Sequence, residues 1–153
     1  MATAHVIIDP DSLGVALESH EAETEWVLDL RSGEVLPVID PAISGDDTVQ
    51  QELEREPQRY LYIEPIPSTQ SFRIMEAFAA GLPPSEARSA LIMALGQHHP
   101  FREFKAALLA LPQLRAQWFA YHDAHMRTIA EQWLEDNGVN GKLRIGPSGA
   151  GGV

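Results

Sequence analysis

The sequence predicts an α+β fold: a small three-stranded antiparallel sheet in the N-terminal half, packed with about four helices in the C-terminal half. Three strand-like segments rich in aliphatic and aromatic residues lie between residues 25 and 64. From residue 68 onward, apolar residues recur at helical spacing, and prolines separate the periodic stretches. Because the strands and the helices occupy separate parts of the chain, the α+β class is favoured over an alternating α/β fold.

The first strands are expected to form a hairpin. Glu25–Leu30 and Val35–Ile39 both have strand patterns, and Gly33 between them suits a tight turn. Pro37 cannot donate a hydrogen bond to a neighbouring strand, which predicts an edge position for the second strand. Arg59–Glu64 is the third expected strand.

Helix-start signals stand on both sides of these strands. Asp9-Pro10 predicts a helix that reaches about His20, because Asp caps a helix and Pro suits its first turn. The acidic connector of residues 40–57 contains a second expected helix, capped by Asp46 or Asp47. Whether Val6–Ile8 adds a fourth strand is left open by the pattern.

Four helices are expected after the sheet. Their starts are predicted near Ser68, after Pro83-Pro84, at His99-Pro100 and at Pro112, and the last should end at Asn137-Gly138. We expect apolar residues of the third and fourth helices to form one core, with Trp118, Ile129 and Trp133 packed on Phe101, Phe104 and Leu108. His125 is expected at the edge of this contact.

The chain of 153 residues has the length of one domain. We expect a single domain over residues 1–139 and a flexible glycine-rich tail over residues 140–153. The tail segment Gly146–Gly151 resembles the opening of a phosphate-binding loop, but the Lys-Ser/Thr pair and the helix that such a loop requires do not follow it.

Composition excludes several classes of site. The chain has no cysteine, which rules out disulfides, thiolate metal sites and cysteine nucleophiles. The absence of a signal-peptide pattern and of a long apolar segment predicts a cytoplasmic protein without a membrane partner. Residues 1–66 contain 15 acidic and 3 basic residues, a net charge of −12, whereas residues 67–153 contain 7 and 8, a net charge of +1. The acidic half should repel nucleic acid.

Five short segments together resemble a known family. They are Trp26–Val35, Tyr60–Ile63, Ser71–Met75, Phe101–Lys105 and Trp118 with Trp133–Gly138. In this order they are similar to a bacterial set called Uncharacterised Protein Family 0158, and the likeness extends from about Val6 to Gly138. The resemblance implies a domain identity and carries no activity, cofactor or catalytic residue.

The sharpest candidate site is a cluster of cationic and imidazole side chains at the start of the third helix. Arg102 and Lys105 lie in its first turns, and His98 and His99 precede them. Positive charge is unfavourable near a helix N-terminus, so a bound anion would reverse its cost. The alternative is that Glu103 and solvent compensate this small cost.

Other candidates are weaker. His122 and His125 are three residues apart on the last helix, but spacing specifies no third metal ligand, and packed histidines are the commoner outcome. Tyr121 and Asp123 adjoin His122 in sequence, yet neighbours on a helix point apart. No nucleophile-elbow or zinc-protease motif is present. We therefore expect no metal and no cofactor, and we assign no catalytic residue.

Two functional hypotheses remain. The first is a non-enzymatic interaction module, adaptor or regulatory, whose acidic half binds a basic protein partner. The second is a protein that binds or hydrolyses a phosphate or nucleic-acid ligand at Phe101–Lys105, with Arg115 or His98 contributing to a common cleft.

Overall fold

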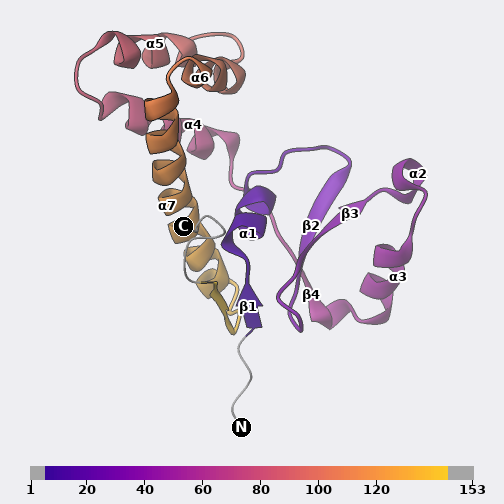
Figure 1. Cartoon of the computed structure of the whole chain (residues 1–153). Helices are drawn as coiled ribbons and strands as arrows, with labels where there is room; N and C mark the ends of the chain where they lie inside the picture. The colour runs from indigo at the N-terminus through magenta and orange to yellow at the C-terminus, as the bar shows by residue number, and fades with distance from the viewer. Residues whose placement is uncertain (1–5, 145–153) are drawn as a thin grey trace. The chain divides into compact units, whose positions relative to one another are not determined.

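The computed structural model describes residues 6–144 and confirms the α+β class. The chain divides into two compact units (Figure 1). We call residues 6–66 together with 126–144 the sheet unit, and residues 67–125 the helical unit. Each unit is described separately below.

The sheet unit contains the predicted antiparallel sheet, with strand order β3-β2-β4. Its strands are β2 (Thr24–Asp29), β3 (Val35–Ile39) and β4 (Tyr60–Tyr62). The edge position predicted from Pro37 is confirmed, because β3 pairs only with β2 among the strands of residues 6–144. β4 is shorter than the expected strand at both ends: Arg59 belongs to the 3-10 turn η1 (Pro57–Arg59), and the strand ends at Tyr62 instead of Glu64.

The turn between β2 and β3 depends on Gly33. Its φ of +84° lies in the left-handed region, where a side chain is disfavoured. A Cβ atom at this position would lie 2.3 Å from the carbonyl oxygen of Ile7, so the turn also packs directly on the backbone of another strand. The prediction of a tight glycine turn is confirmed.

Helix α1 (Pro10–Leu17) begins as predicted. The Asp9 carboxylate accepts a hydrogen bond from the Asp11 N–H at 3.2 Å, and Pro10 occupies the first helical position. Leu13, Ala16 and Leu17 are fully buried and form a large part of the core of this unit.

Val6–Ile8 forms strand β1, which joins a separate two-stranded sheet instead of the antiparallel one. Its partner is β5 (Gly141–Leu143), in parallel register from Val6↔Gly141 to Ile8↔Leu143. β5 lies inside residues 140–153, which the sequence assigns to a loose tail. Residues 141–143 are therefore a strand and not part of a loose tail. The sequence pattern missed this strand because its partner lies 135 positions away, and such distant pairing leaves no local signal in the sequence. The rest of the tail, from residue 145, lies outside the described residues.

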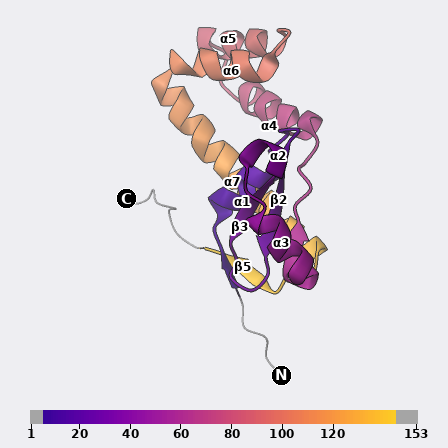
Figure 2. The same cartoon turned by 90° about the vertical axis from the view of Figure 1, so that its right-hand side faces the viewer.

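The acidic connector forms two helices where the sequence predicted one. α2 (Pro41–Ser44) is a single turn capped by Asp40, and α3 (Thr48–Arg55) is the expected helix. Asp46, one of the two proposed caps, accepts the Thr48 N–H at 2.9 Å. Figures 1 and 2 together show α1 and α3 on opposite faces of the antiparallel sheet.

The helical unit contains α4 (Ser68–Ala80), α5 (Glu86–Leu95), α6 (Pro100–Leu109) and the first half of α7 (Pro112–Asp136). The four predicted helices are therefore present. α4 begins at Ser68 as predicted, and Pro67 occupies the cap position without a side-chain capping bond. Ser85 caps α5 through a hydrogen bond from the Arg88 N–H at 3.1 Å.

The predicted aromatic core is only partly correct. Trp118 is 6% exposed, and its ring lies edge-on to Phe104 at 5.1 Å and to Phe78 at 5.4 Å. Ile129 and Trp133 do not join this cluster, because α7 passes into the sheet unit at Met126. A helix of 25 residues is about 37 Å long, more than twice the length of α6, so α6 is long enough to pack along only part of α7.

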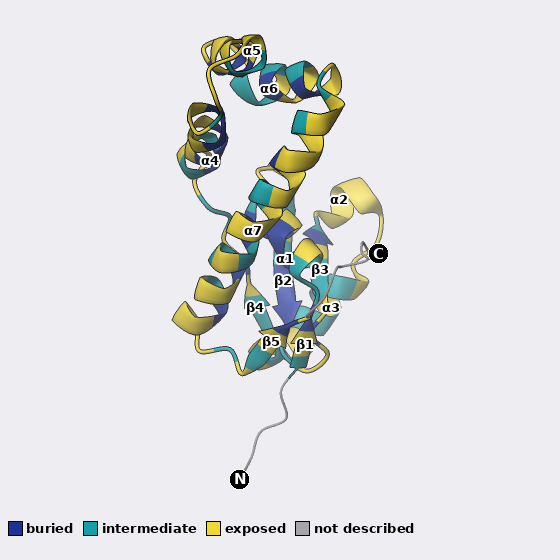
Figure 3. Ribbon diagram, turned by 60° about the vertical axis from the view of Figure 1, so that its left-hand side comes forward, coloured by how far each residue is buried: buried dark blue, intermediate teal, exposed yellow. Residues whose placement is uncertain are grey.

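Burial follows this division (Figure 3). In the sheet unit α1 and β2 contain most of the fully buried residues, and along the second half of α7 the buried side chains are Met126, Ala130 and Leu134. Their four-residue spacing places them on one stripe of the helix. His125, expected at the edge of a contact, is exposed.

Candidate functional site

The predicted anion site at the start of α6 is spread over an exposed surface. The rings of His98 and His99 contact each other at 4.5 Å, and both residues are exposed. Arg102 is 72% exposed and lies 3.8 Å from a carboxylate oxygen of Glu103. Lys105 is also exposed. The site stays a prediction, and it lines none of the hollows described below.

The two histidines of α7 make ring contacts within the helical unit. His122 packs on Trp118 at 5.3 Å, and His125 lies 4.4 Å from the ring of Tyr121. Asp123 approaches His122 at 3.6 Å. Across residues 6–144, no group of three or more His, Cys, Asp or Glu side chains is arranged to hold a metal ion. The loop-like segment Gly146–Gly151 lies outside the described residues.

A hollow of about 470 Å³ opens between α3 and the antiparallel sheet. We call it the acidic hollow. Its lining contains four carboxylates and no cation, together with apolar and amide side chains: Ala22, Glu23, Glu25, Val38, Asp40, Pro41, Gln50, Leu53, Glu54 and Tyr62. Its polar groups are therefore carboxylates, the Gln50 amide and the Tyr62 hydroxyl.

Strand pairing explains how the acidic hollow is built. Glu25 stands directly opposite Val38 in the β2–β3 ladder, and Tyr62 stands opposite Val27 in the β2–β4 ladder. Because alternate residues of a strand point to the same face, these side chains share the face that α3 covers. Gln50 of α3 donates to the Ile39 carbonyl at 2.6 Å and holds the helix over the sheet.

The carboxylates of the acidic hollow have no cationic partner among residues 6–144. Within the part of the chain that the structure describes, Glu23, Glu25, Asp40 and Glu54 form no ion pair. Asp40 accepts a backbone hydrogen bond as the cap of α2. Beside them, Tyr62 leaves 53% of its surface exposed, which provides an aromatic face in the same hollow.

An ion pair with a buried carboxylate, Arg59 with Asp29, involves the turn that follows the C-terminal end of α3. The Arg59 guanidinium donates two hydrogen bonds to the Asp29 carboxylate, at 2.9 and 2.8 Å. Asp29 also accepts the backbone N–H groups of Arg31 and Ser32, at 2.9 and 3.3 Å. These donors, Arg59 first, hold the pKa of Asp29 well below its usual value and outweigh the effect of burial.

Glu56 extends this pair into a network. It accepts from Arg59 at 2.8 Å and from Arg31 at 2.9 Å, which lowers the pKa of Glu56. Hydrogen bonds to Asp29 and then to Glu56 raise the pKa of Arg59 further above its ordinary value. The network therefore fastens the turn after α3 to the β2–β3 turn. Its residues border a hollow of about 650 Å³.

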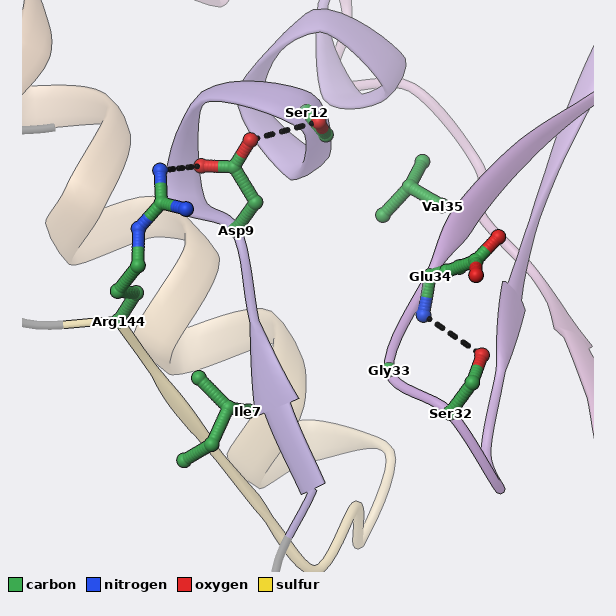
Figure 4. Close-up of a pocket in the computed structure, with 8 residues that line it drawn as sticks. All are labelled: Ile7, Asp9, Ser12, Ser32, Gly33, Glu34, Val35 and Arg144. Atoms are coloured by element: carbon green, nitrogen blue, oxygen red, sulfur yellow. Dashed lines mark hydrogen bonds and ion pairs between the residues drawn. The ribbon is translucent and has the colours of Figure 1, made fainter. Parts of the chain in front are cut away.

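A third hollow, of about 250 Å³, lies where α1 begins (Figure 4). Arg144 donates to Asp9 at 2.9 Å, and Ser12 donates to the other carboxylate oxygen at 2.9 Å. On the facing side, Ser32 accepts the Glu34 N–H. Figure 4 shows the Ser12 hydroxyl directed at the Asp9 carboxylate and the Ser32 hydroxyl directed at the backbone of Glu34.

The sequence predicted neither the acidic hollow nor the hollow of about 650 Å³ that Arg31, Arg55 and Arg59 border. Glutamates stand at positions 21, 23 and 25. Residues two apart on a strand lie on one face, so this spacing is the sequence signal that could have indicated a shared acidic surface. Asp29 and Arg59 are 30 positions apart, so no spacing rule connects them.

No helix within residues 6–144 has the length and apolarity needed to cross a membrane. The model of an uncharacterised protein family, UPF0158, matches residues 4–144. A UPF0158 protein of Pseudomonas aeruginosa is 36% identical over 141 residues, which cover 92% of this chain and 90% of that protein. No solved structure matches the chain.

Proposed function

The chain belongs to the uncharacterised protein family UPF0158, and we propose that it is a non-enzymatic interaction module that binds a basic segment of a partner protein. The observation that carries this proposal is the acidic hollow, whose four carboxylates have no cation opposite them within residues 6–144. A lysine or arginine side chain would supply the missing charge.

The lining suits a long basic side chain in more than its charge. Val38 and Leu53 offer an apolar surface for the methylene stem, because Lys and Arg bury their stems while their charged ends stay near polar groups. The exposed ring of Tyr62 adds a cation–π partner. The net charge of −12 over residues 1–66 would speed the encounter with a basic segment.

The test compares a double variant, Glu25→Gln with Glu54→Gln, against a matched control, Glu76→Gln with Glu86→Gln. The control carboxylates are exposed residues of the helical unit, and the same total charge is removed. The probe is a labelled octalysine peptide, and binding is followed by fluorescence anisotropy at low and high salt.

We expect the hollow variant to bind roughly three- to tenfold more weakly than the wild type, since each exposed charge contributes about 0.3–0.7 kcal/mol. The control should bind as the wild type does. Equal weakening in both double variants would mean that the peptide responds to net charge alone, and it would refute a specific site. Capture of cellular proteins at low salt, compared between the two variants, then identifies the partner.

A further inference from the structure

The three basic residues of the first 66 positions all border one hollow of the sheet unit. This arginine hollow, of about 650 Å³, is lined by Leu30, Arg31, Arg55, Glu56, Pro57, Gln58 and Arg59. The lining contains three arginines and one carboxylate, Glu56. Two further carboxylates, Glu52 and Asp29, pair with Arg55 and Arg59 from outside the lining.

The arginines come from three different elements. Arg31 lies in the turn after β2, Arg55 is the last residue of α3, and Arg59 is the last residue of η1. Their meeting is a product of the fold, because the sequence separates Arg31 from the others by more than twenty positions. The buried carboxylate of Asp29 fixes the Arg59 guanidinium from behind.

Most of the hydrogen-bond donors in the arginine hollow are not used by the protein. A guanidinium has five N–H donors. Arg59 donates three hydrogen bonds, two to Asp29 and one to Glu56. Arg31 donates one to Glu56, and Arg55 donates one to Glu52. The side chains of Arg31 and Arg55 are 64% and 69% exposed, so their remaining donors are accessible to a ligand.

We propose that the arginine hollow binds a phosphate group, either free or as a monoester on a small molecule. Arginine is the side chain best suited to this ligand, because its planar fork donates two parallel hydrogen bonds to phosphate oxygens. The ion pair between Arg31 and Glu56 is exposed to solvent, and exposed ion pairs contribute little to stability. A phosphate dianion can therefore replace Glu56 as the partner of Arg31. This site is separate from the acidic hollow and does not rest on the function proposed above.

Arg55 distinguishes this proposal from a purely structural role of the cluster. Arg59 and Arg31 join the two turns of the chain, so their replacement would disturb the fold in either case. Arg55 pairs only with Glu52 of its own helix, three residues away, among its described contacts. Its replacement should leave the fold intact and remove one phosphate donor.

The experiment measures binding of inorganic phosphate and of glycerol 3-phosphate by isothermal titration calorimetry, at an ionic strength held constant with chloride. The variants are Arg55→Gln and, as a matched control, Arg73→Gln, an exposed arginine of α4 in the helical unit that lies outside the predicted anion site at the start of α6. Circular dichroism and urea unfolding establish that both variants fold as the wild type does.

We expect the wild type to bind both phosphates and Arg55→Gln to bind them about tenfold more weakly, the loss typical of one charge-assisted hydrogen bond. Arg73→Gln should bind both phosphates as the wild type does. The proposal is overturned if the wild type binds neither phosphate, or if Arg55→Gln binds as tightly as the wild type. Preference for glycerol 3-phosphate over inorganic phosphate would identify the monoester as the ligand, and the reverse would identify the free ion.

Discussion

Replacement of Asp29 by Asn tests whether the buried ion pair stabilises the sheet unit. Asp29 is 3% exposed and accepts four hydrogen bonds, two from the Arg59 guanidinium and two from backbone N–H groups. Asn keeps the shape of the side chain but removes its charge and one acceptor oxygen. The Arg59 guanidinium is then left without its main partner.

The expected loss follows from the burial of the two partners. Removing one member of a fully buried pair costs about 3–5 kcal/mol. The Arg59 side chain keeps 23% of its surface exposed, so water can partly solvate its charge once Asp29 is replaced. We therefore expect the free energy of unfolding to fall by about 3 kcal/mol, near the lower end of that range. This is a large part of a typical stability of about 5–15 kcal/mol.

The pH dependence gives an independent check. Because the folded-state pKa of Asp29 is depressed, its stabilisation is fully present above the unfolded-state value of 3.8 and is lost progressively as the pH falls below it. The difference in unfolding free energy between the wild type and Asp29→Asn should therefore be constant from pH 5 to pH 7 and should shrink below about pH 4.

The assay is urea unfolding followed by circular dichroism, with amide hydrogen exchange of β2 to assign the loss to the sheet unit. Glu76→Gln, an exposed carboxylate of α4, is the control and should lie within about 0.5 kcal/mol of the wild type. A loss at Asp29 below about 1 kcal/mol, the range of surface pairs, would refute the interpretation of this pair as a buried clamp.

Three further substitutions test other parts of the fold. Gly33→Ala should cost more than about 1–2 kcal/mol, because φ is positive there and the added Cβ would meet the Ile7 carbonyl; urea unfolding measures the loss, and a neutral result would contradict the turn geometry. Trp118→Ala should cost about 3–5 kcal/mol and Trp133→Ala less, since only the former is buried; equal losses in thermal or urea unfolding would argue against that difference. Ser85→Ala should cost about 1 kcal/mol through the lost cap of α5, whereas Ser85→Gly should recover most of it; calorimetry of both variants decides.

Local signals in the chain were sufficient for most of the secondary structure. Asp9-Pro10 starts α1 and Gly33 turns β2 into β3, because capping and left-handed turns depend on the chemistry of one or two neighbouring residues. The prolines at positions 100 and 112 mark helix starts for the same reason. The short turn at Gly33 predicted that β2 and β3 pair antiparallel, and Pro37 predicted the edge position of β3.

The candidate sites were not predictable in this way, because each gathers residues that are distant in sequence. The acidic hollow combines β2, β3, β4 and α3, and the arginine hollow combines the turn after β2, the end of α3 and η1. The one cluster that local spacing did suggest, at the start of α6, consists of side chains that share a helix end. Proximity along a helix does not by itself enclose a ligand.

The apolar pattern of residues 112–136 was enough to predict one long helix, but it could not say which residues pack against which partner. A helix presents the same period along its whole length, so Trp118 and Trp133 look alike in sequence although they belong to different compact units. The pairing of β1 with β5, and of Asp29 with Arg59, likewise arises only in the folded chain. Interactions between neighbouring residues determine caps, turns and helix starts, so the sequence alone predicts these features. Which distant residues pack together depends on the free energy of the whole fold, so only the tertiary structure determines it.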